Sequence, residues 1–200
     1  MALAIALIVL VCLLVFYRFY FLRDPARCVP IGDNIVSPAD GRVTLITEYD
    51  RNEVNIEKKF FGKVDAITKD VDTKVYIVSI FMNILNVHVN RSPIDGVIKS
   101  TEHSNGRFLN AKRIDATFEN ENIQTLIVDG EFKIKVIQIA GLIARRIASF
   151  IQQDEKVIKG QKIGIIKLGS QVTLILPSTV RLRVKKNQKV FAGKTIIADR

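Results

Sequence analysis

The chain begins with one long apolar run, unlike anything that follows it. Residues 1–17 contain no charged side chain, and Arg18 is followed by the apolar residues Phe19–Leu22. A run of this length matches the ~20 residues that a helix needs to cross a bilayer core. No polar face recurs at helical spacing, which argues against the alternative of a helix buried in a protein core. We therefore predict a membrane-spanning helix over residues 1–22.

The charges beside this run predict its orientation. A cleaved signal peptide starts with basic residues, has a shorter apolar stretch and ends in small residues. Here the basic residues Arg18, Arg23 and Arg27 follow the run. By the positive-inside rule they predict an uncleaved anchor in the cytoplasmic membrane, with the rest of the chain on the cytoplasmic face. Tyr17 and Tyr20 are expected at the membrane interface.

The remainder, residues 23–200, is predicted to form one β-rich domain. Short runs rich in Val and Ile are separated by Gly, Pro, Asn and Asp, and several alternate apolar and polar residues. This period of two is typical of half-buried antiparallel strands. The clearest runs are Val43–Ile46, Val75–Phe81, Phe132–Ile137, Gln171–Leu176 and Val180–Val184. Only Ile143–Gln152 resembles a short helix. The expected fold is mainly β, an antiparallel sandwich or distorted barrel with few short helices.

A short motif occurs twice in this domain. Ser37–Gly41 reads Ser-Pro-Ala-Asp-Gly, and Ser92–Gly96 reads Ser-Pro-Ile-Asp-Gly. Pro-x-Asp-Gly favours a tight turn between strands. The hairpin patterns of Val157–Gly164 and Val184–Ile196 also resemble each other. Such an internal repeat is similar to biotinyl or lipoyl carrier domains, but neither methionine stands beside a lysine, and a carrier function is set aside.

Composition narrows the choice of partner. Thirty Lys and Arg against twenty Asp and Glu give a net charge of +10, which favours an anionic partner. The basic residues are scattered, tryptophan is absent and base-reading motifs are missing, so nucleic acid is not expected. Beside an anchor, each basic residue near anionic headgroups contributes about 1 kcal/mol. Cys12 and Cys28 have neither metal-binding spacing nor a disulfide framework, and no metal site is predicted.

Several segments of the chain resemble the short form of the phosphatidylserine decarboxylase family. Any one of them is weak, but all occur in the family's order along nearly the whole chain, and Asn86–Pro93 is the most distinctive. The segments are Phe21–Arg27, Val36–Gly41, Asn86–Pro93, Gly106–Ala111 with Glu119–Asn122, and Gln138–Ile147 with Leu168–Ser170.

The resemblance implies an enzyme that makes its own pyruvoyl cofactor. Ser170 would attack the carbonyl of Gly169, and cleavage would give chains of residues 1–169 and 170–200 that stay together as a heterodimer, with a higher oligomer open. A serine hydroxyl needs a base to become a nucleophile, and His88 has a suitable pKa. Asp40 could orient the imidazole, as in hydrolase triads.

The expected reaction converts phosphatidylserine to phosphatidylethanolamine. The pyruvoyl group would bind the substrate amine and take up the electrons released with CO2, and His88 would reprotonate the product carbon. Arg91, Arg145 and Arg146 are candidates for binding the headgroup phosphate or carboxylate, because guanidinium pairs bidentately with both.

Simpler interpretations stay open at each position. His88 could be a buried structural histidine, Asp40 a turn carboxylate, Gly169-Ser170 an ordinary turn, and the arginines surface charges. His103 is expected in a solvated loop.

Two departures from the family pattern also matter. Arg91 stands where many long-form relatives have a second histidine, so His88 would serve both processing and turnover. Gln171 follows the cleavage serine, where relatives often have Thr or Arg. The alternatives to phosphatidylserine decarboxylation are decarboxylation of another seryl lipid such as archaetidylserine, or a non-catalytic, membrane-anchored lipid-binding β-domain.

Overall fold

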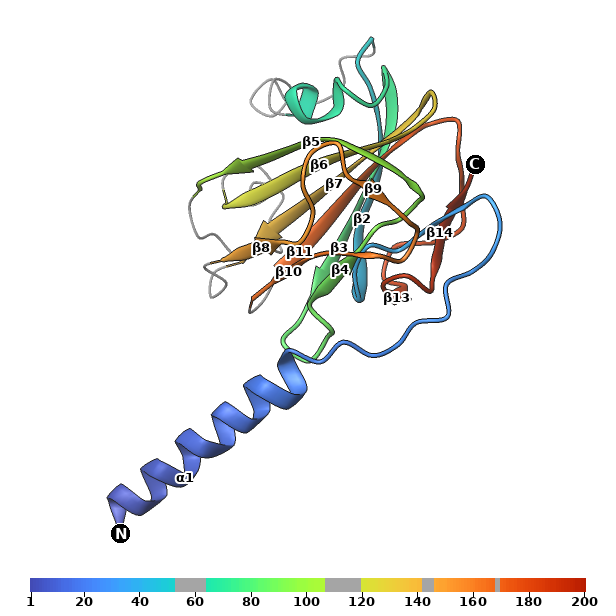
Figure 1. The fold of residues 1–200 in the computed structure, drawn as a ribbon. Coiled ribbons are helices and arrows are strands. Elements are labelled where there is room, and N and C mark those ends of the chain that lie inside the picture. The colour runs from blue at the N-terminus through green and yellow to red at the C-terminus, as the bar shows by residue number, and fades with distance from the viewer. Residues whose placement is uncertain (53–63, 107–119, 142–145, 168–169) are drawn as a thin grey trace.

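The computed structural model describes residues 1–52, 64–106, 120–141, 146–167 and 170–200 (Figure 1). An α-helix, α1 (Ala2–Val15), continues into a π-helical segment, η1 (Phe16–Phe21). Together they form a helix of 20 residues that is long and apolar enough to cross a membrane. The helix projects away from the β-rich body, and α1 contributes no buried residue. The predicted apolar N-terminal helix is confirmed, and the buried core helix is excluded.

The body is mainly β and antiparallel, as predicted. Its largest sheet has eight strands in the order β13-β2-β3-β11-β7-β6-β5-β9, and two three-stranded sheets have the orders β1-β14-β12 and β4-β10-β8. The strands are β1 (Asn34–Val36), β2 (Gly41–Asp50), β3 (Lys74–Met82), β4 (Val89–Arg91), β5 (Gly96–Ser104), β6 (Asn122–Asp129), β7 (Phe132–Ala140), β8 (Ile147–Ser149), β9 (Lys156–Val157), β10 (Lys162–Ile166), β11 (Ser170–Pro177), β12 (Arg181–Leu182), β13 (Lys189–Val190) and β14 (Ile196–Asp199).

The large sheet has apolar clusters on both faces. One cluster joins it to the small sheets and contains Val172 and Leu174 of β11, whereas the other contains Ile175 and packs against Val64 and Ile67. Strand β11 is therefore buried on both sides, which explains its nearly continuous apolar run. Because side chains alternate along a strand, Ser170 faces the same side as Val172 and Leu174.

The predicted helix over Ile143–Gln152 is wrong where the structure describes it. Residues 142–145 lie outside the described part, but Ile147–Ser149 form β8 and pair with β10. Alanine favours a helix, but the segment is short, and its pairing with β10 overrides this local preference. A short helix instead occupies residues 64–68, where none was predicted.

The repeated motif is a true structural repeat. Ser37 Oγ donates to the Ala39 carbonyl at 2.7 Å, and Ser92 Oγ donates to the Ile94 carbonyl at the same distance. Each motif's aspartate then accepts a backbone N–H from a distant hairpin, Ala192 for Asp40 (2.7 Å) and Lys159 for Asp95 (2.8 Å). The two glycines that close the motifs, Gly41 and Gly96, permit close strand contact, because a Cβ there would lie 2.2 Å from the Phe81 carbonyl oxygen and 2.7 Å from that of Val128.

Candidate active site around Ser170 and His88

Ser170 is the first residue of the central strand β11. It lies between Met82 of β3 and Ala140 of β7, and it is fully buried. Its hydroxyl points at the Met82 sulfur, with 3.4 Å between Oγ and Sδ. Gly169 lies outside the described residues, so the bond expected to be cut is seen only from its Ser170 side.

Buried amides surround the same methionine. Asn90 Nδ2 lies 3.8 Å from Met82 Sδ, and Gln138 Nε2 donates to Asn90 Oδ1 at 2.8 Å. Asn120 donates to the backbone carbonyl of Ala140, the residue paired with Ser170, at 2.7 Å. Buried polar groups are costly unless hydrogen-bonded, so this network fixes the positions of its members. Sequence reasoning missed these amides, and only the polar Gln138 within the apolar run of β7 hinted at them.

His88 is fully buried immediately before β4. Its ring stacks on Phe21 of the anchor's last turn, with 4.2 Å between the ring centroids. Neither ring nitrogen has a hydrogen-bond partner within the described part of the chain. The His88 carbonyl accepts a hydrogen bond from Ile166 N–H at 3.3 Å, which ties this residue to the segment that leads to Ser170.

Burial determines the charge of this histidine. It lowers the pKa of His88 to about 4, an effect that the backbone of Asn86 opposes and the positive charge of Arg23 reinforces. The ring is therefore neutral at pH 7 and able to accept a proton. A neutral imidazole has the protonation state that a general base requires.

The buried histidine should also make folding acid-sensitive. The folded pKa of about 4 lies below the ordinary 6.5, so stability is fully present above pH 6.5 and falls as the pH drops toward 4. The loss is on the order of 3 kcal/mol.

We expect His88→Gln to lose less unfolding free energy than its parent between pH 7 and 4.5. Urea unfolding in detergent, in a Ser170→Ala background, measures this. His103→Gln should keep the parental pH dependence, and equal slopes for parent and His88→Gln would contradict the assignment.

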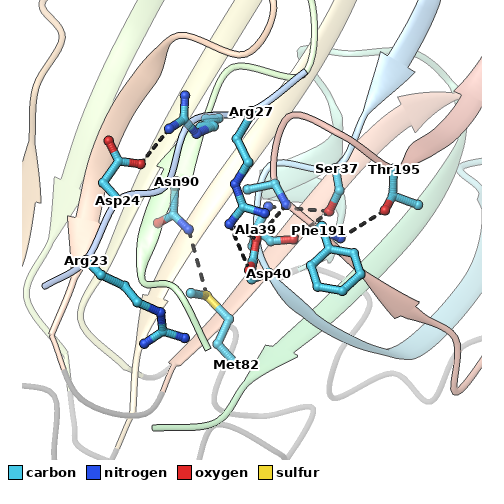
Figure 2. A network of polar contacts seen from close by, with 12 residues as sticks. Arg23, Asp24, Arg27, Ser37, Ala39, Asp40, Met82, Asn90, Phe191 and Thr195 are labelled. Atoms are coloured by element: carbon cyan, nitrogen blue, oxygen red, sulfur yellow. Dashed lines mark hydrogen bonds and ion pairs between the residues drawn. The ribbon is translucent and has the colours of Figure 1, made fainter. Parts of the chain in front are cut away.

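Asp40 is held by an arginine and not by His88. Arg27 Nη2 donates to both carboxylate oxygens of Asp40 at 3.0 Å, and the Ala192 N–H donates to the same group at 2.7 Å. Figure 2 shows Arg27 pointing toward Asp40. No hydrogen bond between Asp40 and His88 is present among the described residues. The backbone hydrogen bond from Ile166 places His88 near the segment that leads to Ser170, whereas Asp40 is paired with Arg27. The catalytic role of Asp40 stays a prediction.

Arg91 and Arg146, two of the three arginines proposed for the headgroup, lie in different surroundings. Arg91 is buried, pairs with Asp24 at 2.5 Å and donates to the Gly160 carbonyl at 2.8 Å. Arg146 lines a separate cavity of about 600 Å³ with His103 and Glu121. Arg145 lies outside the described residues. His103 is exposed, as expected, but on β5 and not in a loop, and it pairs with Glu121 at 3.0 Å.

A larger cavity, of about 660 Å³, lies where the anchor meets the body. Phe81 and Asn83, the neighbours of Met82 in the chain, line it, so it adjoins the strand that contacts Ser170. Its charged lining consists of Arg23, Asp40, Arg42 and Lys189, and its remaining lining residues are Tyr20, Gly41, Thr44, Phe81, Asn83, Leu85, Asn86 and Phe191. Sequence reasoning missed Arg42 and Lys189, because only the pairing of β2 with β13 places them opposite each other.

Comparison with known proteins identifies the family. The family model described as phosphatidylserine decarboxylase matches residues 15–198. A phosphatidylserine decarboxylase proenzyme of Ehrlichia canis is 45% identical over 183 residues, covering 90% of this chain and 74% of the relative. A putative archaetidylserine decarboxylase proenzyme of Methanocaldococcus jannaschii is 41% identical over 189 residues, which cover 94% of this chain and 92% of the relative. A phosphatidylserine decarboxylase proenzyme of Ehrlichia chaffeensis is 43% identical over 183 residues, which cover 90% of this chain and 74% of the relative.

These matches define the class of protein as a decarboxylase, an enzyme of the lyase class. The chain belongs to the phosphatidylserine decarboxylase family.

Proposed function

We propose that this protein cleaves itself between Gly169 and Ser170, converts Ser170 to a pyruvoyl group and then decarboxylates phosphatidylserine to phosphatidylethanolamine at the cytoplasmic membrane face. The observation that carries the proposal is the position of Ser170. It is a buried serine at the head of the central strand, with a buried neutral histidine in the adjoining segment. Both the Ehrlichia canis and the Methanocaldococcus jannaschii relatives are named as proenzymes.

The first step of the processing uses two groups of this chain. Ser170 Oγ attacks the Gly169 carbonyl carbon while His88 takes the hydroxyl proton, and the peptide becomes an ester. Elimination of the ester releases the Gly169 carboxylate and leaves an unsaturated residue at position 170. Water then replaces its nitrogen, which leaves as ammonia, and the oxygen of that water becomes the ketone oxygen of the pyruvoyl group. The overall change breaks one peptide bond and needs no added oxidant.

The surroundings fit a covalent group formed at this place. Ser170 is enclosed, its hydroxyl contacts only the Met82 sulfur among the described polar contacts, and the nitrogens of His88 lack partners there. Once formed, the pyruvoyl group would bind the substrate amine and accept the electrons released with CO2. His88 would hold the proton that returns to the product carbon.

The two products of cleavage should remain associated. Strand β11 of the shorter chain pairs with β3 on one side and β7 on the other. Strands β13 and β14, also in residues 170–200, pair with β2 and β1. Separating the chains would expose the apolar side chains of β11 and break these ladders. A self-derived heterodimer is therefore the expected mature form.

The cavity beside the anchor is suited to the lipid headgroup. Arg42 and Lys189 face each other directly across β2 and β13, and like charges in this position destabilise a sheet. Arg23 adds a third cation, whereas Asp40, the one acidic group in the described lining, is already paired with Arg27. A phosphate bound between Arg42 and Lys189 would relieve their repulsion. The anchor, followed by Arg23 and Arg27, would place this cavity at the cytoplasmic surface of the bilayer.

Removing either cation should weaken substrate binding. We expect Arg42→Ala and Lys189→Ala each to raise KM about tenfold, the effect of losing roughly 1.4 kcal/mol of binding, with kcat little changed. The measurement is CO2 release from mixed micelles at varied phosphatidylserine content. Lys186→Ala, an exposed lysine of the same hairpin, serves as the control and should leave KM unchanged. An unchanged KM in both cavity variants would place the phosphate elsewhere.

A second substrate is supported by one of the comparisons. The archaeal relative, named for archaetidylserine, is covered over 92% of its length. Both lipids carry a phosphoserine headgroup and differ in their apolar chains, so the cavity suits either. Intact mass and CO2 release from the two lipids, measured on the purified protein, test the whole proposal. Decarboxylation by an uncut chain would overturn the pyruvoyl mechanism, and an uncut chain inactive on both lipids would favour a lipid-binding domain.

A further inference from the structure

The loop between β3 and β4 exposes two large apolar side chains beside the anchor. Ile84 is 48% exposed and Leu85 is 54% exposed. The loop is nonetheless well defined: Asn83 Oδ1 accepts the Leu85 N–H at 2.9 Å, and Asn86 Oδ1 accepts the Asn83 N–H at 2.8 Å. The side chains of Asn83 and Asn86 thus satisfy the turn's backbone, and the aliphatic residues between them are presented outward.

The guanidinium of Arg23 fixes the position of this loop along the axis of the anchor helix. Arg23 Nη1 donates to the Tyr20 carbonyl and Nη2 donates to the Leu85 carbonyl, each at 2.6 Å. The guanidinium also lies over the Tyr20 ring, 3.9 Å from its centroid. Because the two nitrogens belong to one rigid group, the backbone of Leu85 must lie level with the last turn of the helix. Figure 1 shows the loop reaching the point where helix and body meet.

We propose that the Asn83–Asn86 loop enters the bilayer interface beside the anchor, with Ile84 and Leu85 in contact with lipid. The inference rests on the proposed function in one respect, the crossing of a membrane by residues 2–21. The occupant of this surface is a lipid bilayer, because the loop is continuous with the lipid-facing end of the helix. Arg23 and Tyr20 are the residue types found where a membrane helix meets water.

This contact would aim the cavity at the membrane. Leu85 and Asn86 belong to the inserted loop and also line the cavity of about 660 Å³, together with Tyr20 and Arg23 from the anchor. The loop and the helix end therefore form the wall of the cavity that faces the bilayer. A lipid could place its headgroup in the cavity while its acyl chains stay among their neighbours.

Tryptophan fluorescence tests the loop directly, because the chain contains no tryptophan. Leu85→Trp is compared with Leu10→Trp inside the anchor and with Ile158→Trp between β9 and β10, a position that is 67% exposed. Each full-length variant is reconstituted into phosphatidylcholine–phosphatidylglycerol vesicles that carry bromine either near the headgroup or deep in the acyl chain. We expect the emission of Leu85→Trp to shift to shorter wavelength and to be quenched most strongly by bromine near the headgroup. The emission of Leu10→Trp should be quenched most strongly by bromine deep in the acyl chain. The emission of Ile158→Trp should be quenched by neither.

The outcomes separate the loop from the anchor. Quenching of Leu10→Trp without quenching of Leu85→Trp would overturn the inserted loop and leave the anchor intact. Quenching of neither would overturn both, and equal quenching of Leu85→Trp and Ile158→Trp would show that the loop is not selectively inserted. Ile84→Trp provides an independent reporter if Leu85→Trp folds poorly. Since fluorescence does not depend on turnover, these results are distinguishable from a failure of the decarboxylase proposal.

Discussion

Replacing Ser170 with alanine should leave the protein as one uncut chain that releases no CO2 from phosphatidylserine. The change removes only the hydroxyl oxygen, whose described contact is the Met82 sulfur. The nucleophile for the Gly169 carbonyl then no longer exists, so neither the ester nor the elimination that leads to the ketone can occur. Intact mass should show full-length protein, whereas the parent should show residues 1–169 and a fragment of 170–200 with a blocked N-terminus that borohydride reduces.

The same strand offers a matched control for this result. Ser178 follows the other end of β11, and its backbone N–H, not its side chain, donates to the Lys74 carbonyl at 2.9 Å. Ser178→Ala should therefore be cut and active like the parent. A 170–200 fragment from Ser170→Ala, or CO2 release by an uncut parent, would refute the role given to Ser170.

Replacing His88 should slow self-cleavage by about 10²- to 10⁴-fold, the usual contribution of a general base. The ring is neutral at pH 7 because burial lowers its pKa to about 4, and its nitrogens are unpartnered among the described residues. His88→Gln keeps a polar side chain of similar reach but cannot take a proton. The measurement is the time course of the 170–200 fragment after synthesis of the protein in a cell-free system with vesicles.

The second histidine of the chain provides the control. His103 is exposed and paired with Glu121, so His103→Gln should be cut at the parental rate. Added imidazole should partly restore cleavage of His88→Ala, in which the side-chain volume is vacated, and not of His88→Gln. Parental cleavage by His88→Gln would reduce His88 to a structural residue packed on Phe21.

Much of the fold was predictable because local pattern and burial agree. The Val- and Ile-rich runs of Val75–Phe81 and Phe132–Ile137 lie within β3 and β7, and the Pro-x-Asp-Gly turns recur with the same hydrogen bonds. The helix predicted over Ile143–Gln152 failed because its short, weakly periodic segment found a partner strand. No local signal separates a short helix from an edge strand when the deciding hydrogen bonds are made to a distant strand, here β10.

The site divides in the same way. Sequence could single out Ser170, His88 and Asp40 as residue types with the right chemistry, but it could not show that Arg27 holds Asp40. It named Arg91 among three candidates for the headgroup, but it could not show that Arg91 pairs with Asp24. Arg42 and Lys189 carried no signal, since they are far apart in the chain and meet only through the register of β2 and β13.

By itself, the sequence determined the apolar helix, the β-rich body, the turn motifs and the residues capable of the chemistry, because these depend on composition and local periodicity. The tertiary structure alone decided that Phe21 covers His88, that Arg23 joins the anchor to the Asn83–Asn86 loop, and that a cavity with three cations lies between them. These features depend on contacts between residues distant in the chain, and on a burial that sets the charge of His88. Neither the contacts between distant residues nor the burial of His88 can be predicted from the local sequence pattern.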